Sequence, residues 1–202
     1  AGNDGGAHPH WPARFASQAW ANGQLIAVGA VDGHNVIAAF SNRAGDAAQF
    51  YLVAPGVSTY STYPGGYARM SGTSMATPHV AGAAALVKSW WPHLAAREVA
   101  AILLTTARDL GAPGVDPIYG RGLLDLEAAM RPVGPLTAPA PNGVDIALAG
   151  TAVQTSTALA TGMRRAAQRG DLVVAGFDAF RRDFAVDLGA TVREPRAIDV
   201  LP

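Results

Sequence analysis

The string GTSMATPHVAG, residues 72–82, places a serine hydroxyl where a long helix of small residues is expected to begin. From Ser74 to Trp91 the only charged residue is Lys88, and Pro92 marks the expected end of the helix. The N–H groups of a first helical turn have no intrahelical partner, so Ser74 would lie in the positive field of the helix N-terminus. That field stabilises a developing oxyanion, which makes Ser74 a candidate nucleophile for acyl transfer.

A serine nucleophile needs an imidazole base that is itself oriented by a carboxylate, and the histidines of this chain suit that role poorly. His8 and His10 lie among prolines, which predicts a surface loop and not a helix that could present two imidazoles to a metal ion. His79 falls within the expected helix, where we expect a neutral, hydrogen-bonded histidine of the core. The sequence therefore predicts no metal and no cofactor.

The composition indicates one sizeable globular core with an appendage. The 202 residues are 50% hydrophobic and 15% charged, and 15 basic residues balance 15 acidic ones. Because charges of both signs are interspersed, we expect no nucleic-acid partner and no membrane-surface patch. The lack of cysteine excludes disulfides, thiol catalysis and cysteine-based zinc sites. The longest apolar run, residues 80–87, is far too short to cross a bilayer.

Short apolar runs ahead of the serine predict buried strands of the parallel-sheet kind. Residues 25–31 are bounded by Asn-Gly and Asp-Gly pairs that form turns, and residues 36–40 and 50–53 form two further runs. After the serine helix, apolar residues at helical spacing predict a second helix over residues 95–107. A short third helix is expected to close this domain near Met130.

The composition changes after the first domain, which we place at residues 1–131. Residues 132–144 contain four prolines within ten positions, which predicts a semi-rigid extended linker. Residues 145–202 are expected to form a small α+β spacer. It would contain a helix with one apolar face, a strand over residues 172–177 and a hairpin across residues 178–182. Basic and acidic residues balance there, so a solvated surface is expected.

The string GTSMATPHVAG resembles the active-site serine segment of the subtilisin-like serine proteases, without a break over eleven residues. The strings VGAVD, AFSNR and VAPG resemble, in the same order, the sheet and loops that precede the serine in that family. The resemblance implies an α/β fold, the C-terminal half of a subtilisin-like domain with a parallel sheet and a buried central helix. It also implies serine endopeptidase chemistry on a polypeptide substrate, with Ser74 as the nucleophile.

The opening string AGNDGG resembles the loop that carries the oxyanion-hole asparagine in that family. This implies that Asn3 donates its side-chain amide to the tetrahedral intermediate, beside the backbone N–H of Ser74. Taken alone, an asparagine in such a loop equally well shapes the turn, because Asn tolerates the left-handed conformation. The family's catalytic Asp and His precede this asparagine, so neither His8 nor His10 is expected to be the base.

The resemblance therefore implies that the catalytic Asp and His belong to sequence ahead of Ala1. We expect this chain to be the C-terminal part of a protease, inactive without its N-terminal part. Residues 145–202 resemble the segment that joins secreted subtilisin-like autotransporters of Gram-negative bacteria to their outer-membrane barrel. This implies secretion or a cell-surface location, with a barrel beyond Pro202 in a longer precursor.

Two other classes of protein stay open. A non-catalytic pseudoprotease or autotransporter passenger stalk, acting in adhesion or display, would carry the same serine segment without a base. An esterase of the α/β-hydrolase kind is disfavoured, because Ala76 replaces the second glycine of the Gly-x-Ser-x-Gly elbow. Its base should also follow the acid in the chain, whereas His79 and His93 come before the candidate acids. Sequence ahead of Ala1 would separate the first alternative from the protease.

Overall fold

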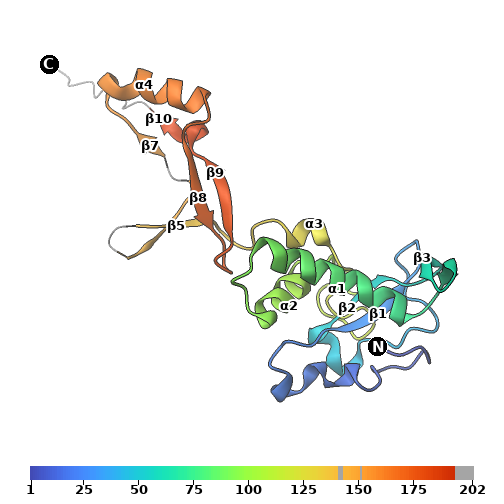
Figure 1. Ribbon diagram of the computed structural model, residues 1–202. Coiled ribbons are helices and arrows are strands. Elements are labelled where there is room, and N and C mark those ends of the chain that lie inside the picture. The colour runs from blue at the N-terminus through green and yellow to red at the C-terminus, as the bar shows by residue number, and fades with distance from the viewer. Residues whose placement is uncertain (141–142, 151, 194–202) are drawn as a thin grey trace. The chain divides into compact units, whose positions relative to one another are not determined.

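The computed structural model describes residues 1–140, 143–150 and 152–193 (Figure 1). The chain divides into two compact units, Ala1–Arg131 and Pro132–Pro202, which we call unit 1 and unit 2. Among the described residues, no helix is both long and apolar enough to span a membrane.

A pair of parallel strands forms the centre of unit 1. Strand β1 (Ala27–Val31) pairs with strand β2 (Tyr51–Pro55), and the register places Gly29 opposite Val53. All of β1 and the first four residues of β2 are buried, as expected for parallel strands that are covered on both faces. These strands correspond to the predicted runs 25–31 and 50–53.

Helix α1 (Thr73–Trp90) packs against both strands, and its bounds agree with the predicted helix to within one residue. Its buried residues follow one face at helical spacing; they are Thr73, Ala76, Val80, Ala83 and Val87. The opposite face is open, with Leu86 47% and Trp90 70% exposed. The sequence predicts a helix that is buried on all sides by the core. The structure buries one face, because the described elements packed most closely on it, β1, β2 and α2 (Ala96–Thr105), leave the other uncovered.

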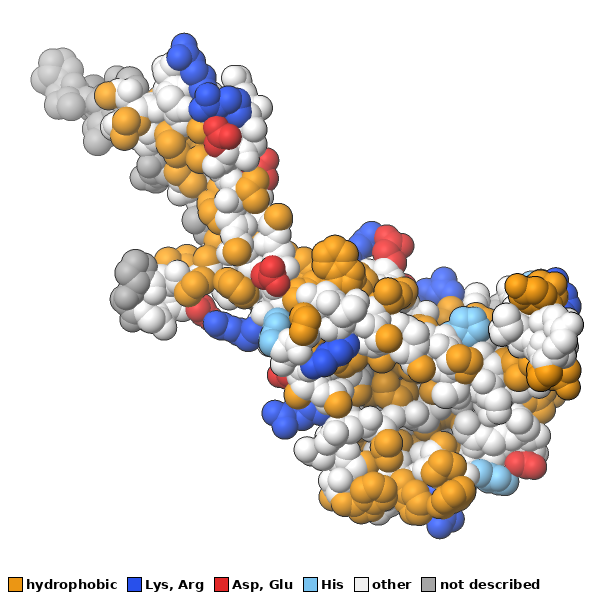
Figure 2. Space-filling model, in the orientation of Figure 1, with side chains coloured by type: hydrophobic (Ala, Val, Ile, Leu, Met, Phe, Trp, Pro, Cys, Tyr) orange, Lys and Arg blue, Asp and Glu red, His pale blue; other side chains and the backbone are white. Residues whose placement is uncertain are grey.

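The rest of unit 1 consists of short elements and one hairpin. They are η1 (Ala13–Ser17), η2 (Ala19–Ala21), η3 (Gly45–Phe50), β3 (Thr59–Tyr63), β4 (Gly66–Met70) and α3 (Leu126–Ala129). Strands β3 and β4 form an antiparallel hairpin whose exposed tyrosines contribute to the hydrophobic side chains visible there in Figure 2. Residues 36–40, predicted as a strand or edge, make only the Val31–Ile37 bridge before the chain turns.

Unit 2 contains a four-stranded antiparallel sheet in the order β6-β5-β8-β9. Its described elements are β5 (Thr137–Pro139), β6 (Asp145–Ala147), β7 (Val153–Gln154), α4 (Thr157–Gln168), β8 (Val173–Phe177), β9 (Asp183–Asp187), η4 (Gly189–Thr191) and β10 (Val192–Arg193). The hairpin predicted across residues 178–182 is confirmed. The predicted linker differs, because residues 137–139 within it are a strand of this sheet. Residues 141–142, 151 and 194–202 lie outside the described residues.

Candidate active site

The start of α1 presents Ser74 on the surface of unit 1. Gly72 precedes the helix, and its carbonyl accepts the N–H of Met75 at 3.0 Å. Thr73 and Ala76 are buried beside the exposed Ser74, so the first turn is anchored while the serine faces outward. Pro78 has no N–H, so the carbonyl of Ser74 cannot make the usual helical hydrogen bond to it. The helix therefore starts with loosened backbone at the serine, as the sequence predicts.

The structure brings Asn3 against this first turn across 70 residues of sequence. The side-chain oxygen of Asn3 accepts the N–H of Thr73 at 2.9 Å. Because an N–H can only donate to the oxygen, this bond defines the orientation of the Asn3 amide and leaves its Nδ2 as a donor. A Cβ placed on Gly72 would lie 3.5 Å from that nitrogen, which locates the amide beside the turn that carries Ser74.

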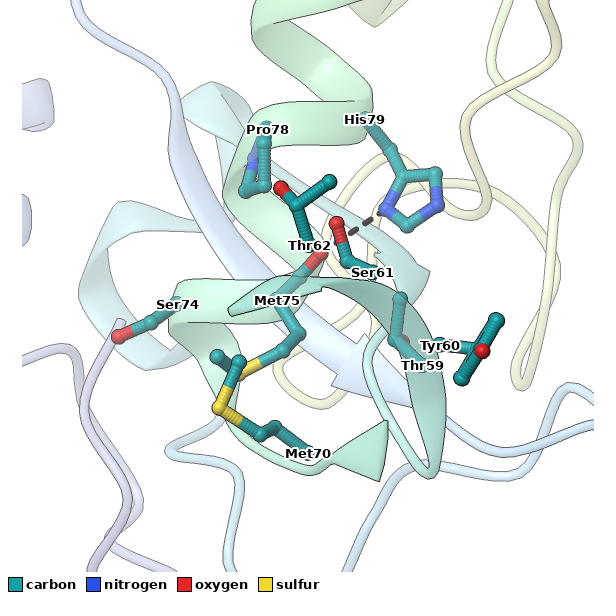
Figure 3. Close-up of a pocket in the computed structure, with 9 residues that line it drawn as sticks. All are labelled: Thr59, Tyr60, Ser61, Thr62, Met70, Ser74, Met75, Pro78 and His79. Carbon is teal, nitrogen blue, oxygen red and sulfur yellow. Dashed lines mark hydrogen bonds between the residues drawn. The ribbon is translucent and has the colours of Figure 1, made fainter. Parts of the chain in front are cut away.

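Ser74 borders two cavities of unit 1. One, of about 320 Å³, lies between the hairpin and α1 (Figure 3). It is lined by Thr59, Tyr60, Ser61, Thr62, Met70, Ser74, Met75, Pro78 and His79. The other, of about 330 Å³, is lined by Ala1, Pro12, Ala13, Leu25, Ile26, Val28, Thr73, Ser74 and Thr77. Ser74 is thus shared by the linings of both cavities.

The structure does not bring the imidazole of His79 to the hydroxyl of Ser74. The Nδ1 atom of His79 lies 2.9 Å from the carbonyl oxygen of Met75, and Figure 3 shows the Ser74 hydroxyl directed away from this imidazole. His79 is exposed because it lies on the uncovered face of α1. The expectation of a core histidine is therefore wrong. His8 and His10 lie on the surface beside Asp46 and Asp4, at 3.2 and 3.1 Å.

Within the described part of the chain, no group of three or more His, Cys, Asp or Glu side chains could hold a metal ion.

Asn42, a residue close to the site, was not predicted from the sequence. It appeared only within the string AFSNR, but its buried side chain contacts the loop that carries Asn3. A buried asparagine in a loop has no local sequence signature, so composition and spacing could not have revealed it.

The structure thus brings together a serine at a helix start, an asparagine amide against the same turn and a parallel pair of strands. Comparison with known families defines the class of protein. Residues 1–122 match the model of the subtilase family, Peptidase S8, and the chain belongs to this family of subtilisin-like serine proteases.

Individual relatives agree with the family match. Subtilisin BL and Subtilisin Savinase of Lederbergia lenta are each 46% identical over 131 residues, which cover 64% of this chain and 44% of theirs. Among solved structures, the self-cleaved protease domain of PatA is 32% identical with a TM-score of 0.53, over 64% of this chain and 46% of that one. The prenylagaramide maturation protease PagA has a TM-score of 0.55 at 32% identity, over 64% and 47%. The chain spans less than half the length of these relatives.

Proposed function

We propose that Ser74 is the nucleophile of a serine endopeptidase and that Asn3 completes its oxyanion hole. The hydroxyl attacks the scissile carbonyl of a polypeptide, and the oxyanion of the tetrahedral intermediate accepts hydrogen bonds from Asn3 Nδ2 and the Ser74 N–H. The observation that carries the proposal is the 2.9 Å bond from the Thr73 N–H to Asn3 Oδ1, since it holds the amide beside the serine. The substrate would occupy the two cavities that Ser74 borders.

The base and its carboxylate would come from sequence outside this chain. The imidazole of His79 is engaged with Met75 on its own helix, and the chain spans less than half of its relatives.

The remaining part of the domain would cover the open face of α1. An apolar groove of about 490 Å³ offers such a surface; it is lined by Gln24, Ile26, Ala84, Ala85, Lys88, Leu94, Ala95, Ala96, Val99 and Ala100. The N-terminal part is thus a proposed partner, and the chain alone is inactive.

A fluorophosphonate probe tests this assignment, because an activated serine attacks its phosphorus, expels fluoride and becomes phosphonylated. We expect it to label Ser74 in a longer protein that includes the preceding sequence, and not to label the 202-residue chain. Adding the N-terminal part in trans should restore labelling of the chain. Ser74→Ala should abolish it, while Ser71→Ala is the control, since Ser71 lies three residues earlier and accepts the Ser58 N–H. An intact protein that resists the probe would instead be the non-catalytic pseudoprotease or stalk.

We further propose that unit 1 is the C-terminal part of the peptidase domain and that unit 2 is a spacer of the autotransporter type. The family match ends at residue 122, inside unit 1, and unit 2 has its own sheet, which supports a separate role. The protein would then be secreted or held at the cell surface of a Gram-negative bacterium by a barrel beyond Pro202. Fractionation of the producing cells, with detection of unit 2, tests this, and recovery in the cytoplasm would contradict it.

A further inference from the structure

Asn42 is fully buried, and the loop of residues 2–8 closes around its side chain. Its Oδ1 accepts the N–H of Asp4 at 2.9 Å and that of Gly6 at 3.2 Å. Its Nδ2 donates to the carbonyl oxygen of His8 at 3.1 Å, and its backbone N–H donates to the carbonyl of Gly2 at 3.0 Å. Both ends of the amide are therefore occupied by the loop backbone.

At Gly2 the loop lies too close to Asn42 for a side chain, and at Gly6 a side chain would be crowded. A Cβ on Gly2 would approach Asn42 Nδ2 to 2.6 Å, and one on Gly6 would approach it to 3.3 Å. On its other side Asn42 is tied to the core, because the hydroxyl of the buried Tyr51 donates to the Asn42 carbonyl at 2.7 Å. Asn42 thus links the strand β2 to the loop.

We propose that Asn42 is a positioning residue of the oxyanion hole. Asn3 lies between the residues that Asn42 binds, so the buried amide determines where the Asn3 side chain stands against Thr73 and Ser74. An amide suits this role because it accepts two N–H groups and donates to a carbonyl from one short side chain. The inference rests on the proposed function of Asn3 and Ser74.

The first test measures kinetics in the longer, active protein. Asn42→Ala should lower kcat about 10- to 100-fold with little change in KM, because a displacement of about 1 Å is enough for a loss of that size. Thr106→Ala is the control, since the partly buried Thr106 hydroxyl donates to the Ile102 carbonyl at 2.7 Å, within its own helical segment and not to Asn42 or the loop. It should leave kcat within about twofold of the parent.

A double-mutant cycle separates positioning from general support of the fold. If Asn42 acts through Asn3, Asn42→Ala should cause little further loss in a protein that already carries Asn3→Ala. An equal loss in both backgrounds would overturn the proposal, and so would an unchanged kcat in a folded Asn42→Ala protein.

A second measurement needs no activity and uses the 202-residue chain. Amide hydrogen exchange at Asp4 and Gly6 should accelerate in Asn42→Ala and stay slow in Thr106→Ala. If circular dichroism shows that Asn42→Ala unfolds, Asn42→Asp replaces it in the kinetic test, since it keeps the acceptor oxygen but loses the donor to His8. Unchanged exchange at both amides in Asn42→Ala would refute the anchoring. If the parent protein is not labelled by the fluorophosphonate, the proposed function is wrong. The exchange measurement still tests, independently, whether Asn42 anchors the loop.

Discussion

Gly29 shows how closely the strands behind the serine are packed. It lies in buried β1, and a Cβ on it would overlap the Tyr51 hydroxyl, which itself bonds the carbonyl of Asn42. Gly29→Ala should therefore lower the free energy of unfolding by about 1–3 kcal/mol, as overpacking of a core does. Gly33→Ala is the control, because a Cβ there meets nothing within 4 Å. Urea denaturation of both variants checks this, and equal midpoints would contradict it.

At the scale of single residues, Ser74 was a candidate because it lies where a helix of small residues begins, and a family resemblance then supported it. Asn3 was assigned its role by that resemblance, and the structure places it against the helical turn that carries Ser74. Asn42 could not be chosen, because its importance lies in bonds to backbone N–H groups some 36 residues away. The exposure of His79 was also beyond local patterns, since it depends on which elements cover α1.

The β8–β9 turn contains an element-scale determinant of stability, a buried ion pair between Asp178 and Arg182. Besides the Arg182 guanidinium, the Asp178 carboxylate accepts the N–H groups of Val133, Phe180 and Arg182. Asp178→Ala should destabilise the hairpin by about 3–5 kcal/mol, because it removes one side of a buried ion pair together with the acceptor of three backbone N–H groups. Amide exchange across β8 and β9 measures this effect.

The exposed ion pair between Arg181 and Asp145, in the same unit, is the matched control. Asp145→Ala removes a carboxylate that water already solvates, so its effect should stay below about 1 kcal/mol. Comparable losses in Asp178→Ala and Asp145→Ala would show that burial of the first pair has no energetic importance.

Elements with a local signature were predictable, and those that depend on distant partners were not. The small-residue run of α1 and the apolar run of β1 lie within two residues of their predicted bounds. Strand β5 was missed, because a proline-rich stretch indicates a linker and its pairing with β8 joins residues 40 apart, Thr137 and Phe177. The prediction for residues 36–40 erred in the other direction, since this apolar run forms a single isolated bridge, Val31–Ile37, and no strand.

At the scale of the whole molecule, the two units differ in the side chains that can titrate. All five tyrosines, all five histidines and the single lysine lie in residues 1–131. Residues 132–202 contain none of the side-chain types that ordinarily change charge between about pH 6 and pH 11. The stability of unit 2 should therefore be nearly constant over that range, and any alkaline loss should belong to unit 1.

The buried Tyr51 determines how the stability of unit 1 changes at alkaline pH. Burial raises the pKa of the Tyr51 hydroxyl above its ordinary value of about 10. Above pH 10 the unfolded chain releases this proton while the folded chain keeps it, so the free energy of unfolding falls as pH rises, by about 1.4 kcal/mol per pH unit. Below pH 10 the contribution is fully present. Tyr51→Phe should flatten this slope, although the loss of the bond to Asn42 lowers stability by about 1 kcal/mol at every pH.

Urea unfolding at pH 8 and pH 11 tests this, with α1 amides reporting on unit 1 and β8–β9 amides on unit 2. Tyr60→Phe removes a hydroxyl from a 61% exposed side chain and should keep the alkaline slope of the parent. If Tyr51→Phe kept that slope as well, the proton retained by the buried hydroxyl would not be its cause.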